Sequence, residues 1–297
     1  MADISIPKEI IDWMNSKGWG DHHIQWHIER RWDRFKNRDL SLAPNRRVIP
    51  WALSQGWKRH HVQEGAKTNG LEFLAMHRIM ILSIVKTFPQ HKDLFKGWEK
   101  VPTNHLDPDN PVSPTNNNYN LLEKHFVTGI NRIENELHSF NSEDVFGIYV
   151  QTTDLPTQLT PLADTKERGA GIHNHLHGRF THEGSPITMA NPIVNIRNRM
   201  FWRLHGWIDK SWTTYRDYHS LQNNDQTYKS ALLEGAKHMR VKDLLFPDPL
   251  PEHIIKSTPK SHTMDDHHHH HRSLEIPHKI LESILSFTYS CNPVEEE

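Results

Sequence analysis

The most constraining feature of this chain is a pair of histidines, His173 and His177, which stand four residues apart in the segment Gly-Ile-His-Asn-His-Leu-His-Gly (171–178). On a helix, residues with this spacing project from one face about one turn apart. Two neutral imidazoles placed in this way make half of a metal site, and donors that are all nitrogen favour copper or zinc over calcium or magnesium. His205 follows in an amphipathic segment, Phe-Trp-Arg-Leu-His-Gly-Trp-Ile (201–208). The pattern therefore predicts a trihistidine metal site carried by helices.

The composition narrows the classes of protein to which the chain can belong. Its 297 residues are enough for a sizeable core, and they include 25 histidines but only one cysteine, Cys291. A single cysteine excludes an internal disulfide framework and a cysteine-rich zinc site. The formal charge of -1 argues against a nucleic-acid partner. No signal peptide or long apolar span is visible, so we expect a cytoplasmic protein without a membrane partner.

Three motifs in order resemble those of the type 3 copper proteins, the family of tyrosinases, catechol oxidases and hemocyanins. His173-Asn174-x-Leu176-His177 looks like the His-Asn-x-x-His helix of that family. Phe201-Trp202 with His205, Asp209 and Trp212 resembles its Phe-Trp-x-x-His-x-x-x-Asp-x-x-Trp segment, and Phe73-Leu74-Ala75-Met76-His77-Arg78 resembles its Phe-Leu-x-Trp-His-Arg helix. The likeness runs from about residue 71 to residue 212. It implies two copper ions as cofactors, one held by His173, His177 and His205 and the other held partly by His77.

The first copper half-site is incomplete by comparison with the family. The family places a loop histidine about nine residues before the counterpart of His77, but no histidine occurs between His61 and His77. His60 or His61 is the candidate for a second ligand, because a helix followed by a tight turn brings neighbouring helix ends together. His22, His23 or His27 is a more remote candidate. Three outcomes stay open: two coppers with a rearranged ligand, one tight and one weak copper, or a single copper.

The resemblance also implies roles for residues near the copper ligands. Asn174 corresponds to an asparagine that helps tyrosinases to orient a water molecule for deprotonation of a phenol. The carboxylate that acts with it in the family corresponds here to Glu167 or Asp164, and we take Glu167 as the candidate general base. Asp209, one turn after His205, is placed to orient its neighbours from outside the ligand set.

The expected fold is mainly α-helical, with a four-helix bundle that directs histidines inward. The strongest helical pattern covers residues 71–88 and ends at Pro89, and further helices are expected over 51–63, about 120–140, 200–218 and 228–245. Residues 145–150, Val-Phe-Gly-Ile-Tyr-Val, are a strand candidate. The segment that holds His22, His23 and His27 is expected to be an amphipathic helix with exposed or hydrogen-bonded histidines.

We expect a tyrosinase-like domain over residues 1–250 and a C-terminal appendage over residues 251–297. The appendage contains a histidine run at 267–271, which is either a tag or a natural metal-binding segment and is kept apart from the site. A short amphipathic helix is expected near 274–289. By its position, the appendage is a candidate cover for the entrance to the site.

The implied function is that of a copper-dependent oxidase or monooxygenase, which uses dioxygen to hydroxylate or oxidise a phenol, catechol or aminophenol. The alternative is a copper or dioxygen binder without enzymatic activity, or a mononuclear copper variant of the fold. Helical spacing by itself predicts only the metal site, and the redox chemistry follows from the resemblance.

Overall fold

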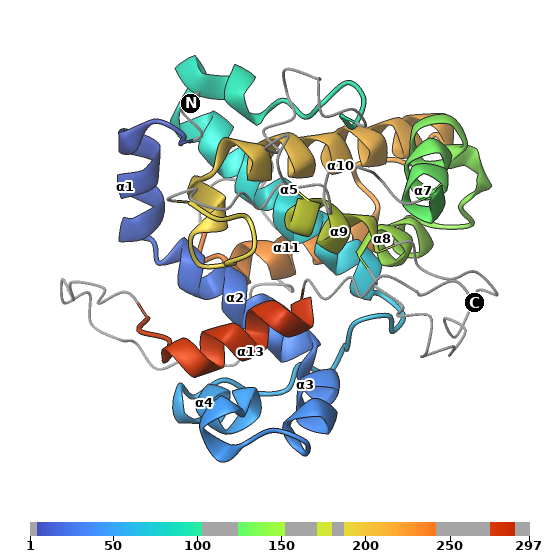
Figure 1. Ribbon diagram of the computed structural model, residues 1–297. Helices are drawn as coiled ribbons and strands as arrows, with labels where there is room; N and C mark the ends of the chain where they lie inside the picture. The colour runs from blue at the N-terminus through green and yellow to red at the C-terminus, as the bar shows by residue number, and fades with distance from the viewer. Residues whose placement is uncertain (1–4, 103–123, 152–170, 180–186, 242–273, 289–297) are drawn as a thin grey trace.

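The computed structural model describes residues 5–102, 124–151, 171–179, 187–241 and 274–288, and this part of the chain is mainly helical, without β-strands (Figure 1). The expectation of a mainly helical protein is therefore confirmed. No helix among these residues is both long and apolar enough to span a membrane. The α-helices are α1 (Lys8–Ser16), α2 (Trp19–Arg30), α3 (Trp32–Asp39), α4 (Val48–Ser54), α5 (Asn69–Thr87), α7 (Lys124–Asn135), α8 (Glu143–Gln151), α9 (Ile172–Arg179), α10 (Arg199–Tyr218), α11 (Gln226–His238) and α13 (His278–Thr288). Short 3₁₀ helices are η1 (Pro44–Arg46), η2 (Pro89–Phe95), η3 (Leu137–Ser139) and η4 (Asn195–Arg197).

Helix α5 is central to the packing of the other helices, and it contacts α8, α10 and α11 (Figure 1). Side chains on most of its faces are buried, in agreement with its apolar sequence. The carboxylate of Asp144 accepts hydrogen bonds from the backbone N–H groups of Thr68 and Leu71, at 2.7 and 3.1 Å, so a residue of α8 satisfies the first turn of α5. The helix ends at Thr87, just before Pro89, as the sequence predicted.

The strand expected over residues 145–150 is wrong, because these residues belong to helix α8. Six apolar residues in a row suit a buried helix as well as a buried strand, and periodicity alone does not separate the two. The helical form lets α8 cross α5 at two glycines. A Cβ on Gly70 would lie 2.4 Å from the backbone nitrogen of Ile148, and one on Gly147 would lie 2.2 Å from the carbonyl oxygen of Gly70. The close crossing of the two backbones therefore requires glycine on both helices.

The prediction of a helix over residues 51–63 is also wrong after residue 54. Helix α4 ends at Ser54, and Gly56 adopts a left-handed backbone with φ of 77°. Glycine tolerates that conformation and often follows a helix end. The chain from Trp57 to Gln63 is irregular, so His60 and His61 do not lie on a helix that faces α5.

Helix α10 packs against α5 and carries the last of the three predicted motifs. Its first turn is capped by Asn198, whose side-chain oxygen accepts a hydrogen bond from the backbone nitrogen of Met200 at 2.8 Å. Gly206 contacts Gly97, and a Cβ at Gly206 would lie 2.4 Å from the Gly97 nitrogen. Gly206 follows His205 directly, so this contact fixes the position of α10 beside a candidate ligand.

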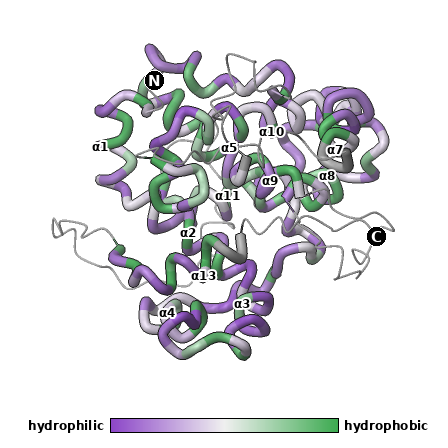
Figure 2. The backbone as a smooth tube through the Cα atoms, viewed as in Figure 1, coloured by the Kyte–Doolittle hydropathy of each residue, from purple (hydrophilic) through white to green (hydrophobic). Residues whose placement is uncertain are grey.

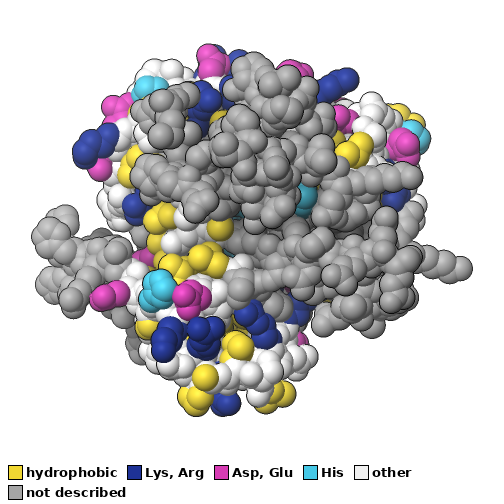
Figure 3. Space-filling model, in the orientation of Figure 1, with side chains coloured by type: hydrophobic (Ala, Val, Ile, Leu, Met, Phe, Trp, Pro, Cys, Tyr) yellow, Lys and Arg dark blue, Asp and Glu magenta, His cyan; other side chains and the backbone are white. Residues whose placement is uncertain are grey.

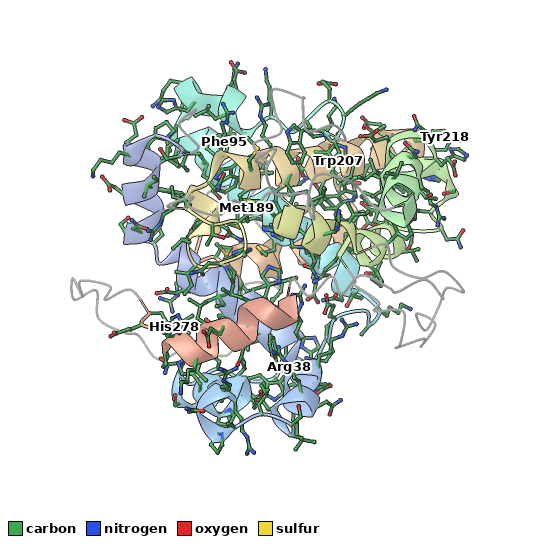
Figure 4. All side chains as sticks on the ribbon, viewed as in Figure 1. Arg38, Phe95, Met189, Trp207, Tyr218 and His278 are labelled. Atoms are coloured by element: carbon green, nitrogen blue, oxygen red, sulfur yellow. The ribbon has the colours of Figure 1, made fainter. Side chains whose placement is uncertain are left out.

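Helix α13 packs on the opposite side of α2 from the main core, against α4 and η1 (Figure 1). Hydrophobic and hydrophilic residues alternate along it, as expected of an amphipathic helix (Figure 2). Arg38, labelled in Figure 4, donates a hydrogen bond from Nη1 to the Ser283 carbonyl oxygen at 2.6 Å. The helix belongs to a second hydrophobic cluster that consists of Ile24, Ile28, Trp32, Phe35, Val48, Ile49, Trp51, Ala52, Trp57, Ile280 and Ile284. The expected C-terminal helix is therefore present and is docked on the body of the protein, while the boundary at residue 250 stays a prediction.

Candidate metal centre

Buried histidines from four helices come together between α2, α5, α9 and α10. Each imidazole ring contacts at least one other ring of the set, and the set is surrounded by Trp26, Phe73 and Phe201. The histidines are His23 and His27 of α2, His77 of α5, His173 and His177 of α9, and His205 of α10. The structure therefore brings together His173, His177, His205 and His77, which the sequence had singled out.

The histidine nitrogens form two overlapping groups, each close enough to hold an ion. The ligand atoms of His23, His27 and His77 lie within 4.8 Å of one another, and so do those of His77, His173 and His205. Three nitrogens at about 2.0 Å from a common ion stand roughly 3.4 Å apart, so both groups need only small side-chain movements to coordinate a metal. His177 lies beside the second group, with its ring centroid 4.5 Å from that of His173 and 5.3 Å from that of His205.

Backbone oxygens fix the orientation of several of these rings. Nδ1 of His23 is 2.8 Å from the Pro192 carbonyl oxygen, and Nδ1 of His177 is 3.0 Å from that of Met189. Within their own helices, Nδ1 of His77 is 2.9 Å from the Phe73 carbonyl oxygen, and Nδ1 of His205 is 2.7 Å from that of Phe201. A carbonyl oxygen can only accept, so each Nδ1 carries the proton and each Nε2 presents its lone pair. Metal-bound histidines are commonly oriented in this way. Met189, labelled in Figure 4, lies in the segment before η4 that approaches the histidines from outside the four helices.

Burial keeps these imidazoles neutral. Desolvation lowers the pKa of His23 to about 4 and that of His177 to about 3, and the hydrogen bonds to Pro192 and Met189 offset it only in part. The pKa values of His27, His77, His173 and His205 are also well below the usual value, first because of burial and then because of neighbouring histidines. Neutral imidazole is the form that binds a metal, so the groups are in the correct protonation state at neutral pH.

One contact in the cluster brings two candidate ligand atoms close together. The Nε2 atoms of His173 and His205 lie 3.0 Å apart. Nδ1 of His205 donates to Phe201, and Nδ1 of His173 lies 3.1 Å from Oδ1 of Asn174, which also accepts a hydrogen bond from Arg31. With both protons on Nδ1, two lone pairs face each other. Nε2 of His77, in the same group, is buried and has no hydrogen-bond partner. The residues therefore fit a metal ion by their chemistry as well as by their spacing.

Asn174 is buried next to the ligands, but it contacts an arginine that the sequence did not indicate. Its Oδ1 accepts a hydrogen bond from Nη2 of Arg31 at 3.2 Å. Arg31 lies between α2 and α3, and its Nε is 3.1 Å from Oε2 of Glu64, whose side chain is buried. Glu167, the predicted general base, lies outside the described residues.

Asp209 contacts a neighbouring arginine and not a candidate ligand. Its carboxylate forms an ion pair with Arg78 of α5, and the Arg78 guanidinium also donates to the Asp209 carbonyl oxygen at 3.1 Å and stacks 3.9 Å from the centroid of the Trp212 ring. Arg78 follows His77, and Asp209 stands one turn after His205. The pair therefore links the helices that carry two candidate ligands, rather than orienting an imidazole directly.

His60 and His61 do not belong to either histidine group. Nδ1 of His60 contacts the Val62 carbonyl oxygen at 3.1 Å, and its Nε2 is 3.4 Å from Nη2 of Arg30. His61 is exposed and packs against His60. The positions proposed for these residues next to His77 are taken by His23 and His27 instead.

His23 and His27 are the site residues that sequence reasoning placed mainly on a surface. Both are buried, and their Nε2 atoms lie 3.1 Å apart. A signal was present in the sequence, since the two are four residues apart in a segment rich in tryptophan and isoleucine. The rest of the information is tertiary, because His23 is held by Pro192, far away in the chain.

A small cavity lies against the histidine cluster. It has a volume of about 10 Å³, and its lining includes His27, His173, His177, Asn174, Arg31 and Ile284. This volume suits about one water molecule. Ile284 belongs to α13, so the C-terminal helix closes one side of the cavity.

No protein-family model, curated protein sequence or solved structure matches this chain.

Proposed function

We propose that the six buried histidines hold a pair of copper ions, and that the protein is a copper-dependent oxidoreductase of the type 3 class. His23, His27 and His77 would bind one ion. Because His77 is then engaged, His177, which lies beside His173 and His205, would complete the ligand set of the other ion. In this proposal, helices α2, α5, α9 and α10 form the four-helix bundle typical of the class. Of the three outcomes left open by the sequence, we favour two coppers with a rearranged ligand set, in which the α2 pair replaces the missing loop histidine.

The observation that carries the proposal is the 3.0 Å approach of the Nε2 atoms of His173 and His205, with both Nδ1 atoms engaged elsewhere. With both protons on Nδ1, the two Nε2 lone pairs converge and can share one cation. Copper is the preferred ion because every donor in the two groups is an imidazole nitrogen, and imidazoles suit both Cu(I) and Cu(II). The buried and neutral state of the rings supports binding without the release of ligand protons at neutral pH.

The chemistry proposed for this site is the oxidation of a phenol, catechol or aminophenol by dioxygen. The bound copper ions would supply electron transfer between the organic substrate and dioxygen. For a catechol, two molecules lose four electrons and four protons in total to give two quinones, and one dioxygen takes them up to give two water molecules. Because neutral imidazoles leave the charge of the ions uncompensated, a deprotonated phenol is favoured as the reacting form. Asn174, held by Arg31, would orient the substrate or a water molecule beside His173.

Copper stoichiometry tests the proposal, measured on protein that lacks the histidine run at 267–271. We expect two copper ions per chain in this parent protein and one in the His27→Gln variant. His238→Gln is the matched control, since His238 is partly buried but hydrogen-bonds to the His22 carbonyl oxygen outside both groups. This variant should retain two ions. Binding of no copper by the parent, or equal copper content in the His27→Gln variant, would contradict the assignment.

Oxygen consumption then tests the activity, with copper-loaded protein and a panel of phenols, catechols and aminophenols. Copper-dependent oxygen uptake with formation of quinone or quinone imine is the expected result. The copper-loaded His205→Gln variant provides the negative control, because it lacks one ligand of the second ion.

A second candidate function is reversible dioxygen or copper binding without oxidation. The cavity of about 10 Å³ favours it, since a small diatomic molecule requires far less space than an aromatic ring. Oxygen that binds and is released without consumption, in protein with two coppers, would support the carrier. A single copper per chain with an isolated Cu(II) signal would instead indicate the mononuclear variant.

A further inference from the structure

We propose that Arg31 is a positioning residue for the metal centre. Through the side chain of Asn174, it selects the tautomer of His173 in which Nε2 presents its lone pair to an ion. The role in metal binding rests on the proposed function, whereas the tautomer is a property of the metal-free protein and can be measured by itself. Neither the family resemblance nor the histidine spacing indicates a residue with this role.

Arg31 is a buried guanidinium directly after α2. It is 2% exposed, unlike the Lys and Arg side chains that gather at the surface around α13 and α4 on the face drawn in Figure 3. Its Nε lies 3.1 Å from Oε2 of Glu64, whose side chain is 1% exposed, so a buried carboxylate balances its charge. The backbone nitrogen of Glu64 donates to the Arg30 carbonyl oxygen at 2.7 Å, which ties this loop to the end of α2. The ion pair therefore holds the guanidinium in a defined position.

The contact with Arg31 decides which end of the Asn174 amide faces the guanidinium. Nη2 of Arg31 is 3.2 Å from Oδ1 of Asn174. A guanidinium has donors and no acceptor, so only the amide oxygen can take this position. A flipped amide would set its NH₂ group against the donors of Arg31. The orientation of this buried amide is therefore determined by the chemistry of its neighbour.

The oriented amide in turn decides which nitrogen of His173 carries the proton. The same Oδ1 of Asn174 lies 3.1 Å from Nδ1 of His173, and an amide oxygen can only accept. The proton is therefore favoured on Nδ1 and the lone pair on Nε2. This Nε2 atom faces another candidate ligand, because it is 3.0 Å from Nε2 of His205. The favoured tautomer is the one that a metal ion requires.

Without Arg31, the opposite tautomer has an advantage in the metal-free protein. Nδ1 of His205 donates to the Phe201 carbonyl oxygen, so Nε2 of His205 is an acceptor. A proton on Nε2 of His173 would form a hydrogen bond to that acceptor, and a flipped Asn174 amide would donate to the vacated Nδ1. In this arrangement the nitrogen that the ion requires is occupied by a proton. Arg31 opposes it, because the flipped amide would leave the buried guanidinium without its acceptor.

The tautomer can be measured by ¹⁵N NMR of histidine-labelled, metal-free, full-length protein, with the His173 signal identified by its loss in His173→Gln. The parent should carry the proton on Nδ1, and Arg31→Met should move it to Nε2, because methionine offers no donor to the amide oxygen. Arg31→Lys should keep part of the population on Nδ1, since an ammonium group also only donates.

Arg30→Met is the matched control for the loss of a buried arginine. Arg30 is also 2% exposed, but its Nε and Nη2 atoms both donate to Glu72 of α5. The proton of His173 should therefore remain on Nδ1 in this variant. A shift to Nε2 in Arg30→Met as large as that in Arg31→Met would show a general effect of repacking and overturn the assignment to Arg31.

Copper affinity tests the consequence, by competition with a chelator in protein that lacks the histidine run at 267–271. Removal of a group that orients a ligand weakens metal binding by about ten- to a hundredfold, and Arg31→Met should show this loss for one of the two ions. The ion assigned to His23, His27 and His77 should keep its affinity. Equal loss of both ions would contradict a role that acts through His173.

The outcomes separate this inference from the proposed function. A proton on Nε2 of His173 in the parent, or on Nδ1 in Arg31→Met, would overturn the positioning role whatever the copper content. If Arg31→Met does not fold, Asn174→Leu removes the amide oxygen and keeps the pair of Arg31 with Glu64; a proton that stays on Nδ1 in that variant would equally overturn the role. A tautomer that depends on Arg31, in protein that binds no copper, would retain the positioning role and refute the metal centre.

Discussion

Acid should destabilise the metal-free protein strongly between pH 7 and pH 5, through protonation of histidines that are buried in the neutral form. The pKa of His23 falls from 6.5 to about 4 on folding, and that of His177 from 6.5 to about 3. Because these folded-state values lie below the unfolded value, the unfolded chain binds more protons below about pH 6.5. The stability conferred by the neutral rings is therefore present above that pH and is lost as the pH falls towards the folded values.

The expected loss is large in relation to the stability of a folded domain. At pH 5 an unfolded histidine is almost fully protonated while both buried rings are still neutral, so each contributes a loss of about 2 kcal/mol relative to pH 7. His23 and His177 together give roughly 4 kcal/mol, and the other four histidines of the cluster change stability in the same direction. A typical domain has only about 5–15 kcal/mol of unfolding free energy.

Urea unfolding followed by tryptophan fluorescence measures this effect on metal-free protein at the two pH values. The midpoint should fall by at least about 1 M urea, given typical denaturant slopes for urea. The His23→Gln, His177→Gln variant is the control and should show a smaller difference between the two pH values. If the parent has the same midpoint at pH 7 and pH 5, the cluster is not buried and neutral, and the metal centre loses its physical basis. In copper-loaded protein, the same protons compete with the metal, so copper should be released over this pH range.

Three further predictions concern the surroundings of the centre. Arg78→Met should lower the unfolding free energy by about 3–5 kcal/mol in urea titrations, because it leaves the partly buried Asp209 unpaired between α5 and α10. Lys8→Met is the control: the ion pair of Lys8 is exposed, so this variant should change the unfolding free energy by less than about 1 kcal/mol. Gly206→Ala should reduce both stability and copper content, measured on the same sample, since its Cβ would meet the Gly97 nitrogen at 2.4 Å; an unchanged copper content would show that α10 can shift without moving His205. Ile284→Ala should enlarge the cavity and increase the affinity for aromatic ligands in calorimetry, and an unchanged affinity would mean that α13 does not limit access.

Much of the helical fold could be predicted from local pattern. The apolar run that ends at Pro89 predicted α5, and the Phe-Trp segment predicted α10 almost to its ends. The pattern failed where the environment decides between alternatives. Residues 145–150 were expected to form a strand, and they form a helix in which Gly147 packs directly on Gly70.

The candidate site could likewise be predicted only in part from the sequence. His77, His173, His177 and His205 could be selected from spacing and motif order, and the structure brings them together. The α2 histidines could not be placed with them, because the sequence does not state which face of α2 meets α5. His60 and His61 were closer to His77 in sequence, but α4 ends at Ser54 and they lie in the irregular chain that follows.

Arg31 and Glu64 were not predicted either. An arginine that follows Glu-Arg in a charged segment looks like a solvated residue. Only the tertiary contacts with Glu64 and Asn174 show that it is buried at the cavity wall. Long-range polar contacts of this kind leave little trace in hydrophobic periodicity.

The carbonyl oxygens of Pro192 and Met189 have a consequence for the rate at which a metal would exchange. They hold His23 and His177 in their final rotamers, so the entropy of ordering these two side chains is lost during folding and not when the ion arrives. A centre prepared in this way should take up its ion with little rearrangement and release it slowly. Substitutions in the segment from Met189 to Pro192 should then shorten the lifetime of the bound ion, although that segment supplies no ligand.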